Sequence, residues 1–269
     1  MFEWAKKLIN KFKSNNKLIE KTEVNIPKTY FCDNIFNFVG NAEKIKEYID
    51  DEGIKTVCEY IENTQQIYIK DLNGKVNVYL ANKSTFVKQL PEVSGDFTEE
   101  QLISLKKMAN LSNSLPFPLK IVFYSSGNKY IFINEQEFNN RKNSSQMSLI
   151  NDHMLIETTK TFQFIVRGGR YISRHNWLVE GQARLITAKA LNNGNMYYTY
   201  HFNTDILNPN GPKFVPIFNK RELTSYNNMK KAMDKLYPEL VYEHCVYFVS
   251  KLSNWEIIDY ITPENDSKK

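Results

Sequence analysis

A change of hydrophobic pattern at residue 147 constrains the fold more than any other feature of the sequence. Before it, short apolar runs alternate with charged and turn residues. After it, apolar residues recur mostly at helical spacing. Helices are predicted over four segments: 147–166, 177–191, 224–236 and 238–252. We therefore expect an α+β chain, with a β-containing N-terminal half followed by a mainly helical C-terminal half.

The strand patterns of the first half are short and are separated by turn residues. Gln66–Lys70 and Lys75–Leu80 flank an Asn-Gly step, which predicts a β-hairpin. Leu119–Tyr124 and Lys129–Asn134 flank a Ser-Gly-Asn turn and predict two further strands. A helix over Thr98–Leu111, with two glutamates in its first turn, is expected between them.

These patterns divide the chain into four parts. They are an amphipathic helix with its linker (1–24), a β-containing subdomain (25–146), a helical subdomain (147–262) and a polar tail expected to be disordered (263–269). Residues 1–13 place apolar side chains on one side of a helix, with lysines on or beside the other. Two interpretations stay open, because such a helix can bind a membrane surface or partner, or can pack on its own domain.

Charge and cysteine content narrow the function classes. The net charge of +5 comes from 35 basic residues, of which 29 are lysine, in a chain that is also rich in asparagine. This composition is typical of an AT-rich genome, so we expect no nucleic-acid partner. The three cysteines have no regular spacing, which favours reduced thiols in the cytoplasm. No apolar run is long enough to predict a transmembrane helix.

Three segments of the helical half share the spacing of a known family. They are Leu155–Gln163 (LIETTKTFQ), Trp177–Ala183 (WLVEGQA) and Tyr242–Leu252 (YEHCVYFVSKL). They resemble the gluzincin zinc metallopeptidases, including the M1 aminopeptidase-like and peptidase MA-like families. Those proteins carry His-Glu-x-x-His on one helix, a glutamate in a Trp-Leu-x-Glu-Gly-x-Ala setting on a second, and a tyrosine on a later one. The resemblance covers roughly residues 75–255 and implies a gluzincin/thermolysin-like fold.

The sequence departs from that family at the metal ligands. Ile156 and Lys160 stand at the two histidine positions, which in the family place both imidazoles on one helix face. The resemblance implies that Glu157 keeps the position of the general base, Glu180 that of the third ligand, and Tyr242 that of the tyrosine that stabilises the transition state.

Loss of both histidines predicts a pseudoenzyme without zinc or any other cofactor. We hypothesise that Lys160 and Glu180 form an ion pair in place of the metal bridge, because a buried carboxylate needs a cationic partner. The predicted function is a catalytically inactive metallopeptidase-like protein that binds a peptide or protein. It is expected in the cytoplasm, and the N-terminal helix offers a peripheral attachment to membranes.

Alternatives to this interpretation stay open. An active metal-dependent peptidase could use a displaced site built from His153, Glu157, His175 and Glu180. A structural or interaction protein, bound peripherally to a membrane, would share only helical patterns with the family. Ordinary helix packing also explains the Trp-Leu-Val-Glu-Gly segment by itself.

Four of the six arginines fall within one short stretch, at positions 167, 170, 174 and 184. Arg167, Arg170, Arg174 and Arg184 are candidate binding residues, since guanidinium groups bind carboxylates and phosphates in a bidentate manner. The alternative is a basic surface loop with local ion pairs, for example to Glu180.

Overall fold

The computed structural model describes residues 28–72, 74–81, 120–125, 127–168, 175–191, 205–207 and 209–252. Several predicted features lie outside the described residues. They are the N-terminal helix, the helix over Thr98–Leu111, the C-terminal tail, Arg170 and Arg174.

The described strands form one mixed sheet in the order β1-β2-β4-β3. The strands are β1 (Asn37–Val39), β2 (Val76–Ala81), β3 (Lys120–Ser125) and β4 (Asn128–Asn134). Strands β1, β2 and β4 are parallel to one another, and β3 pairs with β4 as an antiparallel edge strand. Parallel neighbours require long connections between strands, so this sheet joins segments that are far apart in the sequence.

The predicted strands at 75–80, 119–124 and 129–134 are confirmed, whereas the one at 66–70 is wrong. β3 and β4 form the expected hairpin, whose turn includes Gly127 with a positive φ of 77°. The first predicted hairpin is absent, because Ile69–Leu72 forms a short 3-10 helix, η3, and β2 pairs in parallel with β1 and β4. Burial of Ile69 and Leu72 in the core explains the apolar residues that predicted a strand there.

The remaining described elements are helical. They are α2 (Asp51–Gln65), α5 (Glu135–Arg141), α6 (Met147–Val166), α7 (Asn176–Ala190), α8 (Tyr226–Met233) and α9 (Pro238–Ser250), with 3-10 helices η1 (Phe31–Asn34), η2 (Gly40–Glu47) and η7 (Lys220–Leu223). The predictions for α6 and α7 agree with these bounds to within one residue. Asp50 caps α2 by accepting a hydrogen bond from the backbone N–H of Gly53.

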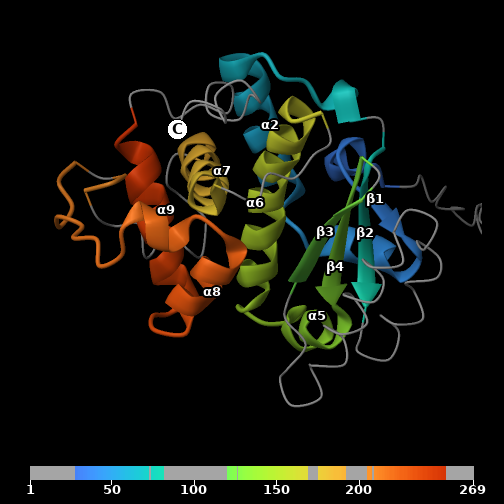
Figure 1. The fold of residues 1–269 in the computed structure, drawn as a ribbon. Helices are drawn as coiled ribbons and strands as arrows, with labels where there is room; N and C mark the ends of the chain where they lie inside the picture. The colour runs from blue at the N-terminus through green and yellow to red at the C-terminus, as the bar shows by residue number, and fades with distance from the viewer. Residues whose placement is uncertain are drawn as a thin grey trace, which may run out of the picture.

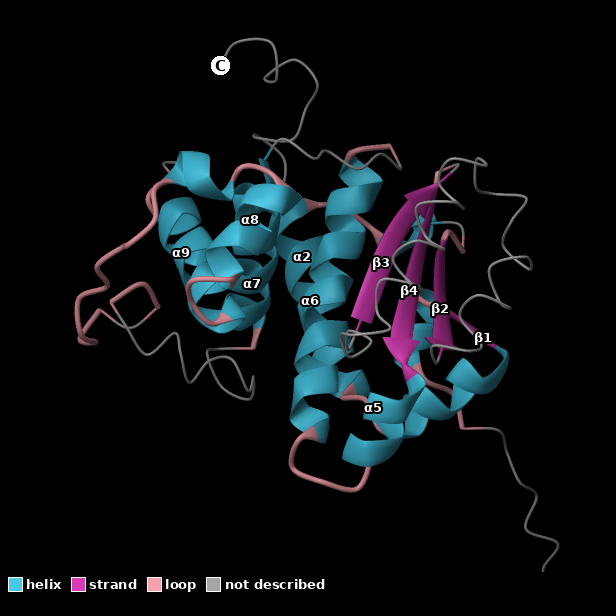
Figure 2. Ribbon diagram, turned by 60° about the horizontal axis from the view of Figure 1, so that its bottom comes forward, coloured by secondary structure: helices cyan, strands magenta, loops and turns pink. Residues whose placement is uncertain are grey.

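Helix α6 lies between the sheet and the C-terminal helices, as Figure 1 shows. One side of α6 faces the sheet, while α7 packs against its other side and α9 packs against α7. The view in Figure 2 shows the same sequence of layers, from the strands through α6 to α7 and α9. Because α6 is covered from two sides, most of its residues are buried, including charged and polar ones.

Helices α7 and α9 meet at a glycine of the Trp-Leu-Val-Glu-Gly segment. A Cβ atom on Gly181 would lie 2.3 Å from the carbonyl oxygen of Cys245 in α9. Trp177 is buried at the start of α7, and its ring meets Phe248 of α9 edge-on. The tryptophan and the glycine therefore have a packing role, whatever the function of the glutamate between them.

None of the helices in the described part of the chain is both long enough and apolar enough to cross a membrane.

Candidate functional site

Glu157, at the centre of α6, is the buried anion around which the site is built. Its side chain has no solvent exposure and faces the sheet. Lys120 of β3 places its Nζ 2.5 Å from Oε1 of Glu157, and Lys129 of β4 places its Nζ 2.7 Å from Oε2. Two strands and one helix therefore converge on a single carboxylate.

The register of the β3–β4 hairpin explains why both lysines reach α6. Tyr124 pairs with Lys129, and Val122 pairs with Ile131. Side chains alternate between the two faces of a strand, so Lys120 lies on the same face as Val122 and Tyr124. Lys129 is fully buried on this face, where its Nζ also lies 3.3 Å from the carbonyl oxygen of Glu157.

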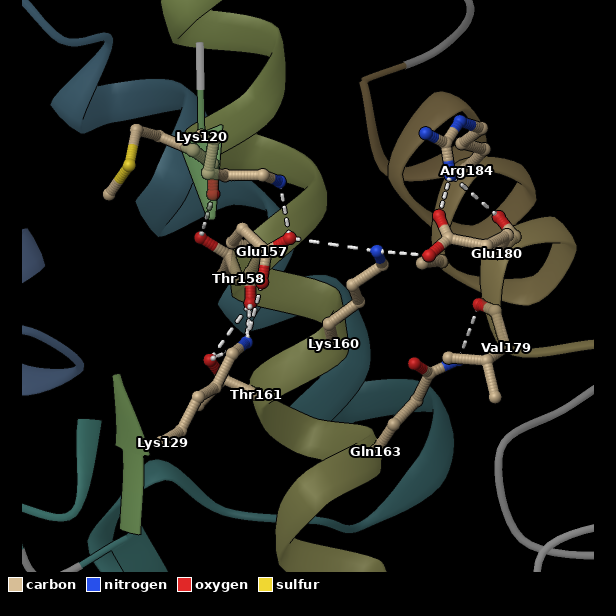
Figure 3. Close-up of polar contacts among 12 residues, drawn as sticks. Lys120, Lys129, Glu157, Thr158, Lys160, Thr161, Gln163, Val179, Glu180 and Arg184 are labelled. Carbon is tan, nitrogen blue, oxygen red and sulfur yellow. Dashed lines mark hydrogen bonds and ion pairs between the residues drawn. The ribbon is translucent and has the colours of Figure 1, made fainter. Parts of the chain in front are cut away.

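Lys160 joins α6 to α7 through an ion pair. Its Nζ lies 2.5 Å from Oε1 of Glu180 and 3.6 Å from Oε1 of Glu157, one turn earlier on α6. The predicted Lys160–Glu180 pair is therefore confirmed. Lys160 also stands between two carboxylates that come from different helices (Figure 3).

Arg184 completes the set from α7. Its Nη1 forms an ion pair with Oε2 of Glu180 and donates a hydrogen bond of 3.2 Å to the Glu180 carbonyl oxygen. The guanidinium carbon lies 3.5 Å from the ring centroid of Tyr242 in α9, which is a cation–π arrangement. Tyr242 thus lies beside the site, with its ring against Arg184.

Uncharged polar contacts fix α6 against α7 on either side of the ion pair. The hydroxyl groups of Thr159 and Thr187 are 2.7 Å apart. Gln163 donates from its Nε2 to the carbonyl oxygen of Val179 at 3.0 Å and to Oε1 of Gln182 at 3.2 Å. These contacts hold the Lys160–Glu180 pair between two helices that are fixed against each other.

We call the six residues of this set the charge cluster: Lys120, Lys129, Glu157, Lys160, Glu180 and Arg184. Figure 3 shows that most of them alternate in sign from β3 across α6 to α7. Four cationic side chains meet two carboxylates, which leaves a formal excess of two positive charges. The more exposed members are Lys120, Lys160 and Glu180, whose side chains keep 12–19 % of their accessible surface.

The pKa values of the two glutamates show how strongly the cations act. Burial alone would raise the pKa of Glu157, but Lys120, Lys129 and Lys160 outweigh it and hold that pKa well below its usual range. At Glu180, Lys160 and Arg184 likewise outweigh burial, and they lower the pKa to about 2. Both carboxyl groups are therefore ionised at neutral pH.

The pKa values of the three lysines are shifted in different directions. Burial lowers the pKa of Lys120 to about 8 and also lowers that of Lys129, in spite of Glu157. Burial opposes the charge of Lys160 too, but Glu180 and Glu157 together raise its pKa to about 12. For Lys120 and Lys129, burial therefore disfavours the charged form more than the shared carboxylate of Glu157 favours it.

The other predicted site residues have different surroundings. Ile156 is fully buried in the hydrophobic core. Arg167 follows the last residue of α6 and is partly exposed. His153 lies one turn before Glu157, and burial together with the charges of Lys120 and Arg184 holds its pKa well below 6.5. His175 is the residue that precedes α7.

The displaced metal site requires His153, Glu157, His175 and Glu180 to gather around one point. Among the residues that the structure describes, no three His, Cys, Asp or Glu side chains lie close enough together to hold a metal ion. The described residues therefore do not assemble this alternative site.

Lys120 and Lys129 were missed as site residues, although the sequence holds a signal for each. Both occupy positions of a predicted strand that share a face with apolar residues, namely Val122 and Ile131. A lysine at such an inward-facing position predicts a buried carboxylate on the element that covers the sheet.

Comparison with known proteins identifies no relative: no protein-family model, no curated protein and no solved structure matches this chain.

Proposed function

We propose that this chain is a catalytically inactive, metallopeptidase-like protein that binds a peptide or a segment of a protein. One observation carries the proposal. The ammonium group of Lys160 lies between Glu157 and Glu180, the two positions that correspond to the general base and the glutamate ligand of a gluzincin site. A fixed organic cation there would take over the structural task of a metal ion, without its Lewis acidity.

The residues present do not fit a zinc ion. Ile156 offers no donor atom, and Lys160 is a cation at neutral pH. Zinc binds deprotonated or neutral donors, so a charged lysine in a ligand position opposes it. The two carboxylates that remain are already engaged by cationic side chains.

The environment of Glu157 also argues against proton transfer by this group. A general base works best when its pKa lies near the operating pH and when it can reach the substrate. Glu157 has a pKa held well below its usual range, and its side chain is inaccessible to solvent. These properties suit a structural counter-ion better than a catalyst.

The sheet offers a place for an extended peptide. Within the described residues, β3 forms one end of the sheet and pairs with β4 on one side only. An edge strand can add a further strand through main-chain hydrogen bonds, which is a common mode of peptide recognition. Since Lys120 begins β3, a peptide bound along this edge would lie beside the charge cluster.

Metal binding tests the pseudoenzyme part of the proposal. We expect the protein, stripped by a chelator and then dialysed against zinc, to retain less than stoichiometric metal by elemental analysis. The variant Ile156→His/Lys160→His restores the His-Glu-x-x-His pattern and should bind zinc at least tenfold more tightly than Lys55→His/Glu59→His, which places the same pair on α2. Stoichiometric zinc in the unmodified protein would overturn the proposal, and equal affinity of the two variants would overturn the correspondence with the family.

Peptide selection tests the binding part. Peptides selected from a synthetic library on the immobilised protein should slow hydrogen exchange of the backbone amides in residues 120–125. A library that yields no binder, or binders that protect only segments away from β3 and α6, would contradict the proposed mode of binding.

A further inference from the structure

The excess of positive charge in the charge cluster calls for an additional anion. Burial of an uncompensated charge is costly, so clusters of this kind are normally neutralised by a partner, by a ligand or by loss of a proton. Among the described residues, Glu157 and Glu180 are the carboxylates in contact with the four cations. Two carboxylates are therefore shared by four cations, and the charge cluster carries a net formal charge of +2.

Two of the four cations are placed to receive an anion from solvent. Lys129 is fully buried and the Arg184 side chain is only 4 % exposed, whereas Lys120 and Lys160 keep 14 % and 12 %. The ammonium groups of Lys120 and Lys160 lie 2.5 Å and 3.6 Å from the same oxygen, Oε1 of Glu157. The two ammonium groups therefore lie close to each other.

Both ammonium groups have N–H donors that no described residue uses. An ammonium group carries three N–H donors. Within the described residues, the Nζ of Lys120 contacts one acceptor atom, Oε1 of Glu157. The Nζ of Lys160 contacts that atom at a long distance and Oε1 of Glu180 at a short one. An oxygen-bearing anion could therefore accept a hydrogen bond from each lysine without displacing either glutamate.

We propose that the ammonium groups of Lys120 and Lys160 form a binding site for an oxyanion, either the carboxylate of a bound peptide or free phosphate. The carboxylate source rests on the proposed peptide-binding function, whereas the phosphate source does not depend on it. Both anions present oxygens that accept charge-assisted hydrogen bonds, and both reduce the excess positive charge.

The protonation of Lys120 supports this site. The charged groups around Lys120 are Glu157 and Lys160 on α6, Glu180 and Arg184 on α7, and Lys129 on β4; the neutral imidazole of His153 also lies on α6. Burial holds the pKa of Lys120 at about 8 in the absence of a ligand. A bound anion would favour the charged form, so binding near pH 8 should take up a proton.

Calorimetric titration of the full chain tests the site, after chelator treatment so that metal has no part in the result. The titrants are inorganic phosphate and an N-acetylated pentapeptide with uncharged side chains, prepared with a free C-terminal carboxylate and as its C-terminal amide. The variant Lys120→Gln removes the charge of one lysine, and Lys55→Gln removes the charge of an exposed lysine on α2 as a control. Circular dichroism and thermal unfolding establish that each variant is folded.

We expect phosphate to bind the unmodified protein and Lys55→Gln alike, and at least tenfold more weakly to Lys120→Gln. Proton uptake at pH 8, measured in two buffers of different ionisation enthalpy, should disappear in Lys120→Gln. A tenfold preference for the free carboxylate over the amide identifies a peptide as the source, whereas phosphate binding without that preference identifies the free anion.

Two results would overturn the site. One is the absence of any heat or proton uptake with both anions, and the other is equal binding by Lys120→Gln and the unmodified protein. Should Lys120→Gln fail to fold, the chemical shift of the Lys120 side chain, measured in the unmodified protein with and without phosphate, decides instead. These results are distinct from the zinc measurement, which tests the proposed function alone.

Discussion

Replacement of Glu180 by glutamine removes the carboxylate that Lys160 and Arg184 share. In the folded protein the pKa of Glu180 is about 2 instead of 4.5, because these two cations outweigh the effect of burial. A difference of this size between the folded and unfolded states stabilises the folded state by about 3 kcal/mol. The raised pKa of Lys160 reports the same ion pair from the other partner, so it adds nothing to this figure.

The sign of the pH dependence follows from the direction of the shift. A carboxyl group whose pKa is lower in the folded state contributes its full stability above its unfolded pKa, here 4.5. The contribution is lost as the pH falls toward about 2, where the folded protein also takes up the proton. The free energy of unfolding of Glu180→Gln should thus be lower than that of the unmodified protein by about 3 kcal/mol at pH 7 and by about 1 kcal/mol at pH 3.

Urea unfolding at the two pH values measures this difference, and thermal unfolding should show a decrease in Tm of roughly 6–12 °C at pH 7. The control is Glu137→Gln, which breaks a 2.8 Å ion pair with Arg141 on the partly exposed surface of α5. Such pairs contribute up to about 1 kcal/mol. A loss below 1 kcal/mol for Glu180→Gln at pH 7, or the same loss at pH 3, would refute the reasoning.

Three further predictions concern packing, thiols and a buried histidine. Gly181→Ala should lower the free energy of unfolding by about 1–3 kcal/mol, because the new methyl group meets the backbone of α9 at 2.3 Å; a stabilised variant would contradict this contact, since alanine is otherwise the better helix former. Burial raises the pKa of all three cysteine thiols, so Ellman's reagent should label none in the folded protein and three in urea, and rapid labelling of the folded protein would be inconsistent with the fold. The Nε2 of His244 accepts a 2.8 Å hydrogen bond from the backbone N–H of Ile217, and burial lowers the pKa of this histidine. The hydrogen bond therefore stabilises the fold above pH 6.5 and weakens as the pH falls. Amide exchange at Ile217, corrected for its intrinsic pH dependence, should accelerate below pH 6.5 in the unmodified protein and should show no such change in His244→Gln.

Local patterns predicted the helices well and the sheet only in part. Helix α6 is covered from two sides, so its apolar residues recur along its whole length and mark both of its ends. The β3–β4 hairpin is likewise a local feature, fixed by one turn. By contrast, β2 pairs with β1, about 40 residues earlier, and with β4, about 50 residues later. No local turn signal reports such parallel pairings, and the Asn-Gly step after η3 favoured a hairpin that does not form.

The residues of the candidate site could likewise be predicted only in part. The sequence resemblance predicted the Lys160–Glu180 contact, which the structure confirms. It gave no indication that Lys120 and Lys129 would join Glu157 from the sheet, because helix motifs carry no information on which strand residues face them. The correspondence with the metallopeptidases itself stays a prediction. It depends on the positions of Glu157, Glu180 and Tyr242 relative to one another.

The wiring of the charge cluster restricts how this protein can change over generations. Glu157 forms ion pairs with lysines from three elements, and Glu180 forms ion pairs with Lys160 and Arg184. A substitution at one position therefore leaves a buried charge unpaired at another. Single substitutions within this arrangement are therefore expected to cost stability. We expect positions 120, 129, 157, 160, 180 and 184 to vary together in descendant sequences, with a neutral pair replacing an ionic pair in linked changes.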